Sequence, residues 1–262
     1  MVEKVVVDVV ATIGAAYRYI LNHRRAVRRI GFLLFVVSAL LTIAWESFIA
    51  IASAGVVERL TVLGAIVAVN ISASVATATA LAASILWDAK PTGWFRPRYG
   101  LVELQISLLV IALFVAGTAA YSVVAQSWTT VEAGLYAFLG IVAIAALAVA
   151  AVRLSLGVPY SAAGRRFDLA RSWHITRGNF WSLLLVNLFA FLPVVLLAYF
   201  VDAVIQRLRD FYAGFIATAP LLTIVEAAAN GAIQVLIVAL ATALASFAFL
   251  TIAPRPIHIV KS

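Results

Sequence analysis

The stretch RLSLGVPYSAAGRRFDLARSWHITRGNFWSLLL, residues 153–185, interrupts a chain that is 65% hydrophobic. It contains five arginines, a histidine, three glycines and two tryptophans, and it ends in a return to leucine. Apolar residues such as Ala163 and Ala170 recur at helical spacing on one side, and arginines fall on the other. This pattern predicts a short helix over residues 160–173 that lies on a membrane surface, before the chain re-enters the membrane.

The residues that flank this surface helix predict where the neighbouring apolar runs end and begin. Gly157 and Pro159 disfavour a continued helix, so we expect the preceding run to end there. Asn179 has a side chain that accepts hydrogen bonds from free backbone N–H groups. We therefore expect Asn179 to cap a helix that begins at Phe180.

The composition of the whole chain is that of a membrane protein. Its mean hydropathy is +1.10 and only 11% of its 262 residues are charged, whereas about a quarter are charged in soluble proteins. Runs of about 20 apolar residues match a hydrocarbon core about 30 Å thick. Six such runs occur, at residues 30–49, 60–86, 101–124, 133–152, 180–201 and 227–252. The sequence predicts an all-α fold, a polytopic integral membrane bundle of about six transmembrane helices in one domain, residues 1–262.

Three further regions complete the predicted layout around the six-span bundle of residues 30–252. Residues 1–29 place valine and isoleucine at spacings of three and four and end in a basic cluster, which predicts an amphipathic interfacial helix. Residues 206–223 are too polar at their start for a span and too apolar for a free loop, so an interfacial helix is expected there as well. Residues 253–262 form a tail. We expect no cleaved leader, because the first long apolar run follows the basic cluster.

The placement of charge predicts the orientation. All of the 19 lysines and arginines except Arg59, Arg207 and Arg209 fall in segments that lie on the same side as the two termini. Cytoplasmic loops carry an excess of basic residues. We therefore expect a multi-pass protein of the plasma membrane with both termini cytoplasmic.

One set of residues in the interrupting stretch forms a family-like pattern: Pro159, Gly164, Leu169, Ala170, Ser172, Trp173, Thr176, Arg177, Gly178, Asn179, Phe180 and Trp181. It resembles the membrane domain associated with bacterial glycerophosphoryl diester phosphodiesterases and its uncharacterised stand-alone relatives. The resemblance covers residues 153–185 and implies a helical protein of the bacterial inner membrane with no established activity of its own. The catalytic barrel of some members is not expected here, since no soluble stretch is long enough to build one.

Catalytic and metal-binding groups are sparse in the sequence. The chain has no cysteine, which excludes disulfides, thiolate nucleophiles and sulfur-ligated metals. His23, His174 and His258 lie in predicted surface segments without a partner at metal-ligand spacing. The 11 acidic residues are scattered, so no pair suggests general acid–base chemistry. We expect no catalytic residue, no metal and no cofactor, and a function that is not enzymatic. A membrane-embedded hydrolase is the third hypothesis, after the accessory component and the transporter described next.

The arginines predict a surface for lipid or partner binding. They are Arg24, Arg25, Arg28, Arg29, Arg165, Arg166, Arg171 and Arg177. A basic residue next to a membrane attracts anionic headgroups by about 1 kcal/mol, and Trp173 and Trp181 suit interfacial anchors. We expect a membrane-organising or accessory component that contacts anionic lipid or a partner protein, and no nucleic acid. The alternative is that these arginines only set the topology.

A polar stripe supports a second function. Glu226, Asn230 and Gln234 recur every four residues and so share one face of the last span. A polar face at membrane depth turns inward, either satisfied by Asn70 or Asn187 in helix packing or lining a wet path. Packing favours the accessory component, and a wet path favours a small-molecule or lipid transporter.

Small residues recur along the second span. Ala68, Ser72, Ala76 and Ala80 lie four residues apart and share a face. Such faces let helices approach closely, which predicts central packing or self-association.

Overall fold

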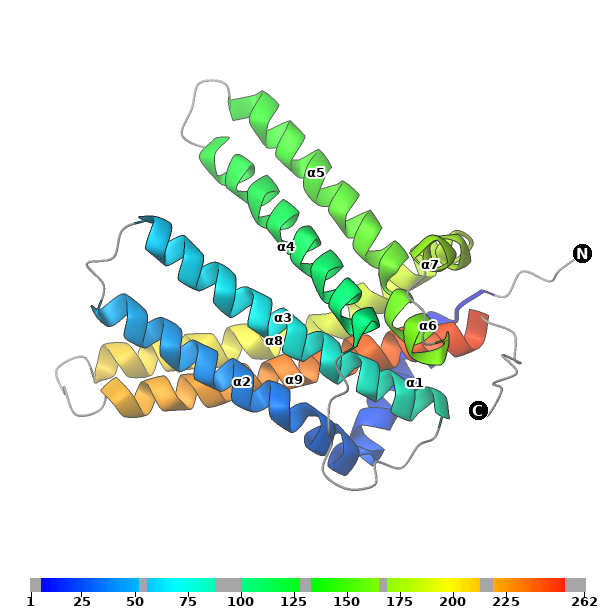
Figure 1. Ribbon diagram of the computed structural model, residues 1–262, viewed down its shortest axis with the longest axis horizontal. Coiled ribbons are helices and arrows are strands. Elements are labelled where there is room, and N and C mark those ends of the chain that lie inside the picture. Colours follow the sequence, from blue (N-terminus) through cyan, green and yellow to red (C-terminus); the bar gives the residue numbers. More distant parts are fainter. Residues whose placement is uncertain are drawn as a thin grey trace, which may run out of the picture.

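The computed structural model describes residues 6–51, 56–87, 100–127, 133–164, 169–212 and 219–252. Within these ranges every regular element is an α-helix (Figure 1). The helices are α1 (Val9–Asn22), α2 (Arg24–Ile51), α3 (Val56–Trp87), α4 (Leu101–Ser127), α5 (Ala133–Leu154), α6 (Gly157–Gly164), α7 (Leu169–Thr176), α8 (Phe180–Phe211) and α9 (Ala219–Ile252). Six of them, α2, α3, α4, α5, α8 and α9, are long and apolar enough to cross a membrane. The predicted all-α fold of a multi-pass membrane protein is confirmed.

The short helices gather at one end of the bundle (Figure 1). There α1 leads into α2, and α6 and α7 connect α5 to α8. We call this the basic end, because it carries the exposed residues Arg24, Arg25, Arg28, Arg29 and Arg177. The last turns of α9 lie at the same end as α1, as an even number of spans requires (Figure 1).

At the opposite end, two helices extend beyond the predicted spans. α8 continues to Phe211 and α9 begins at Ala219, so the described part of residues 206–223 belongs to two long helices rather than one interfacial helix. With 32 residues, α8 is about 48 Å long at about 1.5 Å per residue, longer than a hydrocarbon core of about 30 Å. Hydropathy misses such extensions because helical backbone hydrogen bonds form whatever the polarity of the side chains.

The interrupting stretch folds as two short helices rather than one. α5 ends at Leu154, and α6 begins three residues later. Pro159 does not end a helix, because it lies in the first turn of α6, where a backbone N–H has no helical acceptor in any case. Residues 165–168, between α6 and α7, lie outside the described part.

The N-terminal amphipathic helix is α1, and it packs on protein. The Asp8 carboxylate caps it by accepting a hydrogen bond from the backbone N–H of Ala11 at 2.9 Å. Ala16 is fully buried in a cluster with residues of α8 and α9. The helix ends before His23, so the basic cluster that follows forms the first turns of α2 instead of the end of the amphipathic helix.

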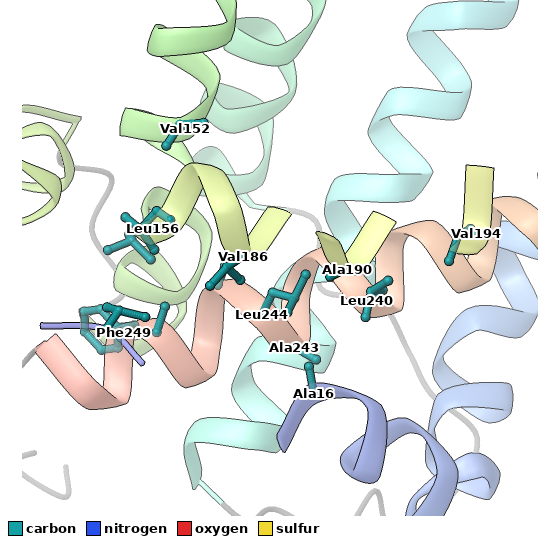
Figure 2. Packing of buried hydrophobic residues seen from close by; sticks show 14 residues of the cluster. Ala16, Val152, Leu156, Val186, Ala190, Val194, Leu240, Ala243, Leu244 and Phe249 are labelled. Atoms are coloured by element: carbon teal, nitrogen blue, oxygen red, sulfur yellow. The ribbon is translucent and has the colours of Figure 1, made fainter. Parts of the chain in front are cut away.

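The core surrounds α9. Half of the most apolar window of α9 is buried, against 28% or less in the other five long helices. Its residues Leu240 and Leu244 pack against Val186 and Ala190 of α8, with Ala16 of α1 on the near side (Figure 2). α9 therefore serves as the central helix that α1, α2, α3 and α8 contact.

Two glycines allow α2 and α9 to pack closely. A Cβ on Gly231 of α9 would lie 2.8 Å from the carbonyl oxygen of Phe35 in α2. A Cβ on Gly31 of α2 would lie 2.5 Å from a methyl group of Val235. The small-residue face predicted for α3 is packed less tightly. Of its four residues, Ala76 is buried, and Ala68, Ser72 and Ala80 are half-buried.

α4 and α5 form a hairpin that diverges from the other long helices with distance from the basic end (Figure 1). The two helices meet closely at Gly140, where a Cβ would lie 3.2 Å from the carbonyl oxygen of Ala120. Ile106 and Ser107, near the start of α4, are buried. Beyond them most described side chains of the hairpin are exposed and apolar.

Candidate functional site

The basic end presents four arginines on one side of α2. Arg24, Arg25, Arg28 and Arg29 are all exposed. On the opposite side of the same turns, Val27 and Ile30 are buried against α3 and α9. This arrangement points the arginines away from the bundle.

The other predicted basic residues are placed only in part. Arg177, between α7 and α8, is exposed. Arg171 lies in α7, but its side chain is not described, and Arg165 and Arg166 lie outside the described residues. Within the described ranges, Arg209 at the opposite end forms ion pairs with Glu46 and Glu226, and none of the exposed arginines of the basic end forms one.

α7 is fastened to the end of α5 by the Ser172 hydroxyl, which donates to the carbonyl oxygen of Arg153 at 3.1 Å. The Thr176 hydroxyl lies 3.3 Å from the same oxygen, but its single proton is closer to the carbonyl oxygens of Ser172 and Trp173 in α7, both at 3.0 Å. Both side chains are fully buried. Helix ends leave their last carbonyl groups without intrahelical donors, so the Ser172 hydroxyl satisfies the end of α5 and fixes α7 against it. The sequence pattern contained both residues, but their partner was not predicted.

Asn179 binds the backbone of Val7, before α1, rather than capping α8. It occupies the N-cap position, but its side chain forms no capping hydrogen bond. Its Oδ1 instead accepts from the backbone N–H of Val7 at 3.0 Å. Asn179 and Val7 are both buried, so this bond ties the segment before α1 to the start of α8.

Tyr17 forms a contact between α1 and α8 that the sequence did not predict. Its hydroxyl donates to the carbonyl oxygen of Ala190 at 2.8 Å. Pro193 lies inside α8 and has no N–H to donate to the preceding turn. The carbonyl that Pro193 leaves without a helical donor is that of Phe189, so the Tyr17 bond to Ala190 attaches α1 to α8 one residue further along. Burial raises the pKa of the Tyr17 hydroxyl above its ordinary value of 10.0.

The polar stripe of α9 finds its partners within the bundle. The Arg209 guanidinium of α8 donates to Glu226 and lies 3.7 Å from a carboxylate oxygen of Glu46 in α2. Gln234 donates to the Ser74 hydroxyl of α3 at 3.3 Å. Asn230, between them, is exposed.

The two asparagines proposed as partners of this stripe bind elsewhere. Asn70 accepts a hydrogen bond from the Ser38 hydroxyl at 3.1 Å. Asn187 donates to the carbonyl oxygen of Leu183 in its own helix at 2.7 Å. Helix registers decide these pairs, and the register of one helix against another cannot be obtained from hydropathy.

The two interfacial tryptophans are exposed, Trp173 by 46% and Trp181 by 72%. His174 is exposed as well, His23 stacks on Tyr19 with ring centres 4.5 Å apart, and His258 lies outside the described residues. No three His, Asp or Glu side chains in the described ranges are grouped so that they could hold a metal. Comparison of the chain with protein-family models, with curated proteins and with solved structures finds no match.

Proposed function

We propose that this chain is a non-enzymatic accessory or membrane-organising protein of the bacterial inner membrane that gathers anionic lipid at its basic end. One observation supports this function. Arg24, Arg25, Arg28 and Arg29 occupy the first two turns of α2, all exposed and without a carboxylate partner in the described part. The N-terminus of a helix carries a partial positive charge, which disfavours a cation in the first turn, here Arg24 and Arg25, by about 0.3–1 kcal/mol. Anionic headgroups offset that cost, and the basic end then faces the cytoplasm together with both termini.

The stripe on α9 supports the accessory function over transport. Glu226 and Gln234 have partners on α8 and α3, so two of the three polar side chains are used in helix packing. A transport path needs polar groups that remain available to a solute. The exposed Asn230 keeps the transporter as the second candidate.

Lipid analysis of the protein in polymer-bounded nanodiscs, extracted directly from the native membrane, tests the proposed function. The wild type should retain more anionic lipid than the bulk membrane contains. The variant with the four substitutions Arg24→Gln, Arg25→Gln, Arg28→Gln and Arg29→Gln should lose most of this enrichment. Arg207→Gln, which removes an exposed arginine at the opposite end, is the matched control and should keep the anionic enrichment.

The alternative that the arginines only set the topology is tested on the same variants. A single cysteine at position 174 can be introduced cleanly, because the chain has none of its own. An impermeant thiol reagent should fail to label it in intact cells for both the wild type and the fourfold variant. Equal anionic enrichment in correctly oriented wild type and variant contradicts the proposed lipid surface.

A further inference from the structure

Arg153 is a charged side chain that the fold holds in a fixed position. It lies in the last turn of α5, and its guanidinium carbon is 5.3 Å from the ring centre of Trp173 and 5.5 Å from that of Phe180. Its Nη1 donates to the carbonyl oxygen of Trp173 at 3.4 Å. Rings from α7 and α8 thus orient one guanidinium from α5 through cation–π contacts.

Arg153 forms no ion pair with a carboxylate of the described residues, unlike Arg209. Its Nε is buried and has no hydrogen-bond partner. A guanidinium has five N–H donors, and removing a cation from water is costly unless an anion or acceptors replace the water. The buried Nε is closed to a ligand, so an anion would use the N–H donors of Nη1 and Nη2, for which the one hydrogen bond within the described part of the chain is that of Nη1 to Trp173.

The length of α5 is consistent with a position of Arg153 at the level of lipid phosphates. α5 has 22 residues and is about 33 Å long at about 1.5 Å per residue, close to the hydrocarbon thickness of about 30 Å. Arg153 stands at the end of this helix, at the basic end. The exposed Trp173 ring lies against it, and tryptophan favours the headgroup level of a bilayer.

We propose that Arg153, held between Trp173 and Phe180, binds the phosphate group of a single membrane phospholipid. A guanidinium beside aromatic rings can still offer a pair of N–H donors for bidentate contact with phosphate oxygens. The phosphate is common to anionic and zwitterionic phospholipids, so the site takes both. This inference rests on the lipid contact of the proposed function, but it does not depend on the net charge of the headgroup.

Native mass spectrometry of the full chain, released from a phosphate-free detergent, tests the site. The probes are short-chain phosphatidylcholine, short-chain phosphatidylglycerol, the matching diacylglycerol and inorganic phosphate. The wild type should form a saturable one-to-one adduct with both phospholipids. Arg153→Gln should weaken that adduct about tenfold, the effect expected from loss of a charge-assisted hydrogen-bond pair. Arg18→Gln, which removes an exposed arginine bonded only to its own helix, should leave it unchanged.

A second variant keeps the test valid if Arg153→Gln does not fold. Arg153→Lys retains the charge but loses the planar fork, and should weaken the adduct several-fold. Unchanged affinity in a folded Arg153 variant overturns the proposal, and so does equal binding of the diacylglycerol. Inorganic phosphate bound as tightly as phospholipid also overturns it, because the ligand is then a free anion. The proposed function fails separately, if native membranes give no anionic enrichment while the phosphatidylcholine adduct persists.

Discussion

Close packing of α2 on α9 makes a quantitative prediction for Gly231→Ala. The new Cβ would lie 2.8 Å from the carbonyl oxygen of Phe35 and 3.1 Å from its ring. The first distance is below van der Waals contact and the second is tight, and the backbone oxygen cannot rotate away, so the two helices must move apart. Overpacking of this kind costs about 1–3 kcal/mol.

Gly117→Ala is the matched control, because a Cβ on Gly117 of α4 would meet no atom within 4 Å. Both substitutions gain the helix propensity of alanine, about 1 kcal/mol, so the difference between them isolates the packing cost. Unfolding in mixed micelles of mild detergent and dodecyl sulfate, followed by circular dichroism, should show Gly231→Ala less stable than Gly117→Ala by about 1–3 kcal/mol. Equal unfolding free energies in the two variants would refute the close packing of α2 on α9.

Three further substitutions test the contacts that sequence reasoning did not predict. Tyr17→Phe should cost about 1 kcal/mol of unfolding free energy. Because burial raises the pKa of Tyr17 above 10.0, the stability that its hydroxyl contributes is complete below pH 10.0 and is lost as the pH rises through the pKa of the folded protein. The unfolding temperature of the wild type should therefore fall in alkali more than that of the variant. Ser172→Ala should release α7 and speed proteolysis of the interrupting stretch in nanodiscs, whereas Ser122→Ala, which loses a bond within its own helix, should not. Arg209→Gln should destabilise the protein by leaving two carboxylates unpaired. Adding Glu226→Gln should recover part of that loss, and a double-mutant cycle with no coupling would contradict the ion pair.

The architecture could be predicted because it follows from composition and period. Apolar runs long enough for a bilayer gave six helices of spanning length, and residues 1–21 gave the amphipathic pattern of α1. The ends of helices were less predictable. α8 runs ten residues past the end of its apolar run at Val201, since polar side chains such as Arg209 find partners on neighbouring helices.

The contacts of the candidate sites could not be predicted, because they join residues far apart in the chain. Tyr17 and Ala190 are 173 positions apart, and Gln234 and Ser74 are 160 positions apart. The periodicity of one helix shows which residues share a face, but it does not show the rotation and shift of the helix packed against it. Asn179 illustrates the same limit locally, because a distant backbone N–H takes the acceptor that its own helix was expected to use.

The attachments of α1 bear on how the basic end would bind lipid. The segment is bonded to α8 through Val7 and Tyr17, and the Tyr19 hydroxyl shares a hydrogen bond with Ser84 of α3 at 2.5 Å. These contacts span nearly the full length of α1, so protein packing rather than lipid fixes its position. The arginines of α2 follow after a single residue, His23, and are therefore placed before any lipid arrives. Binding at a surface already in place avoids the entropy of ordering loops. Tyr17→Phe removes one of the three attachments and leaves those of Val7 and Tyr19, so it should reduce anionic enrichment only in part, without removing any positive charge.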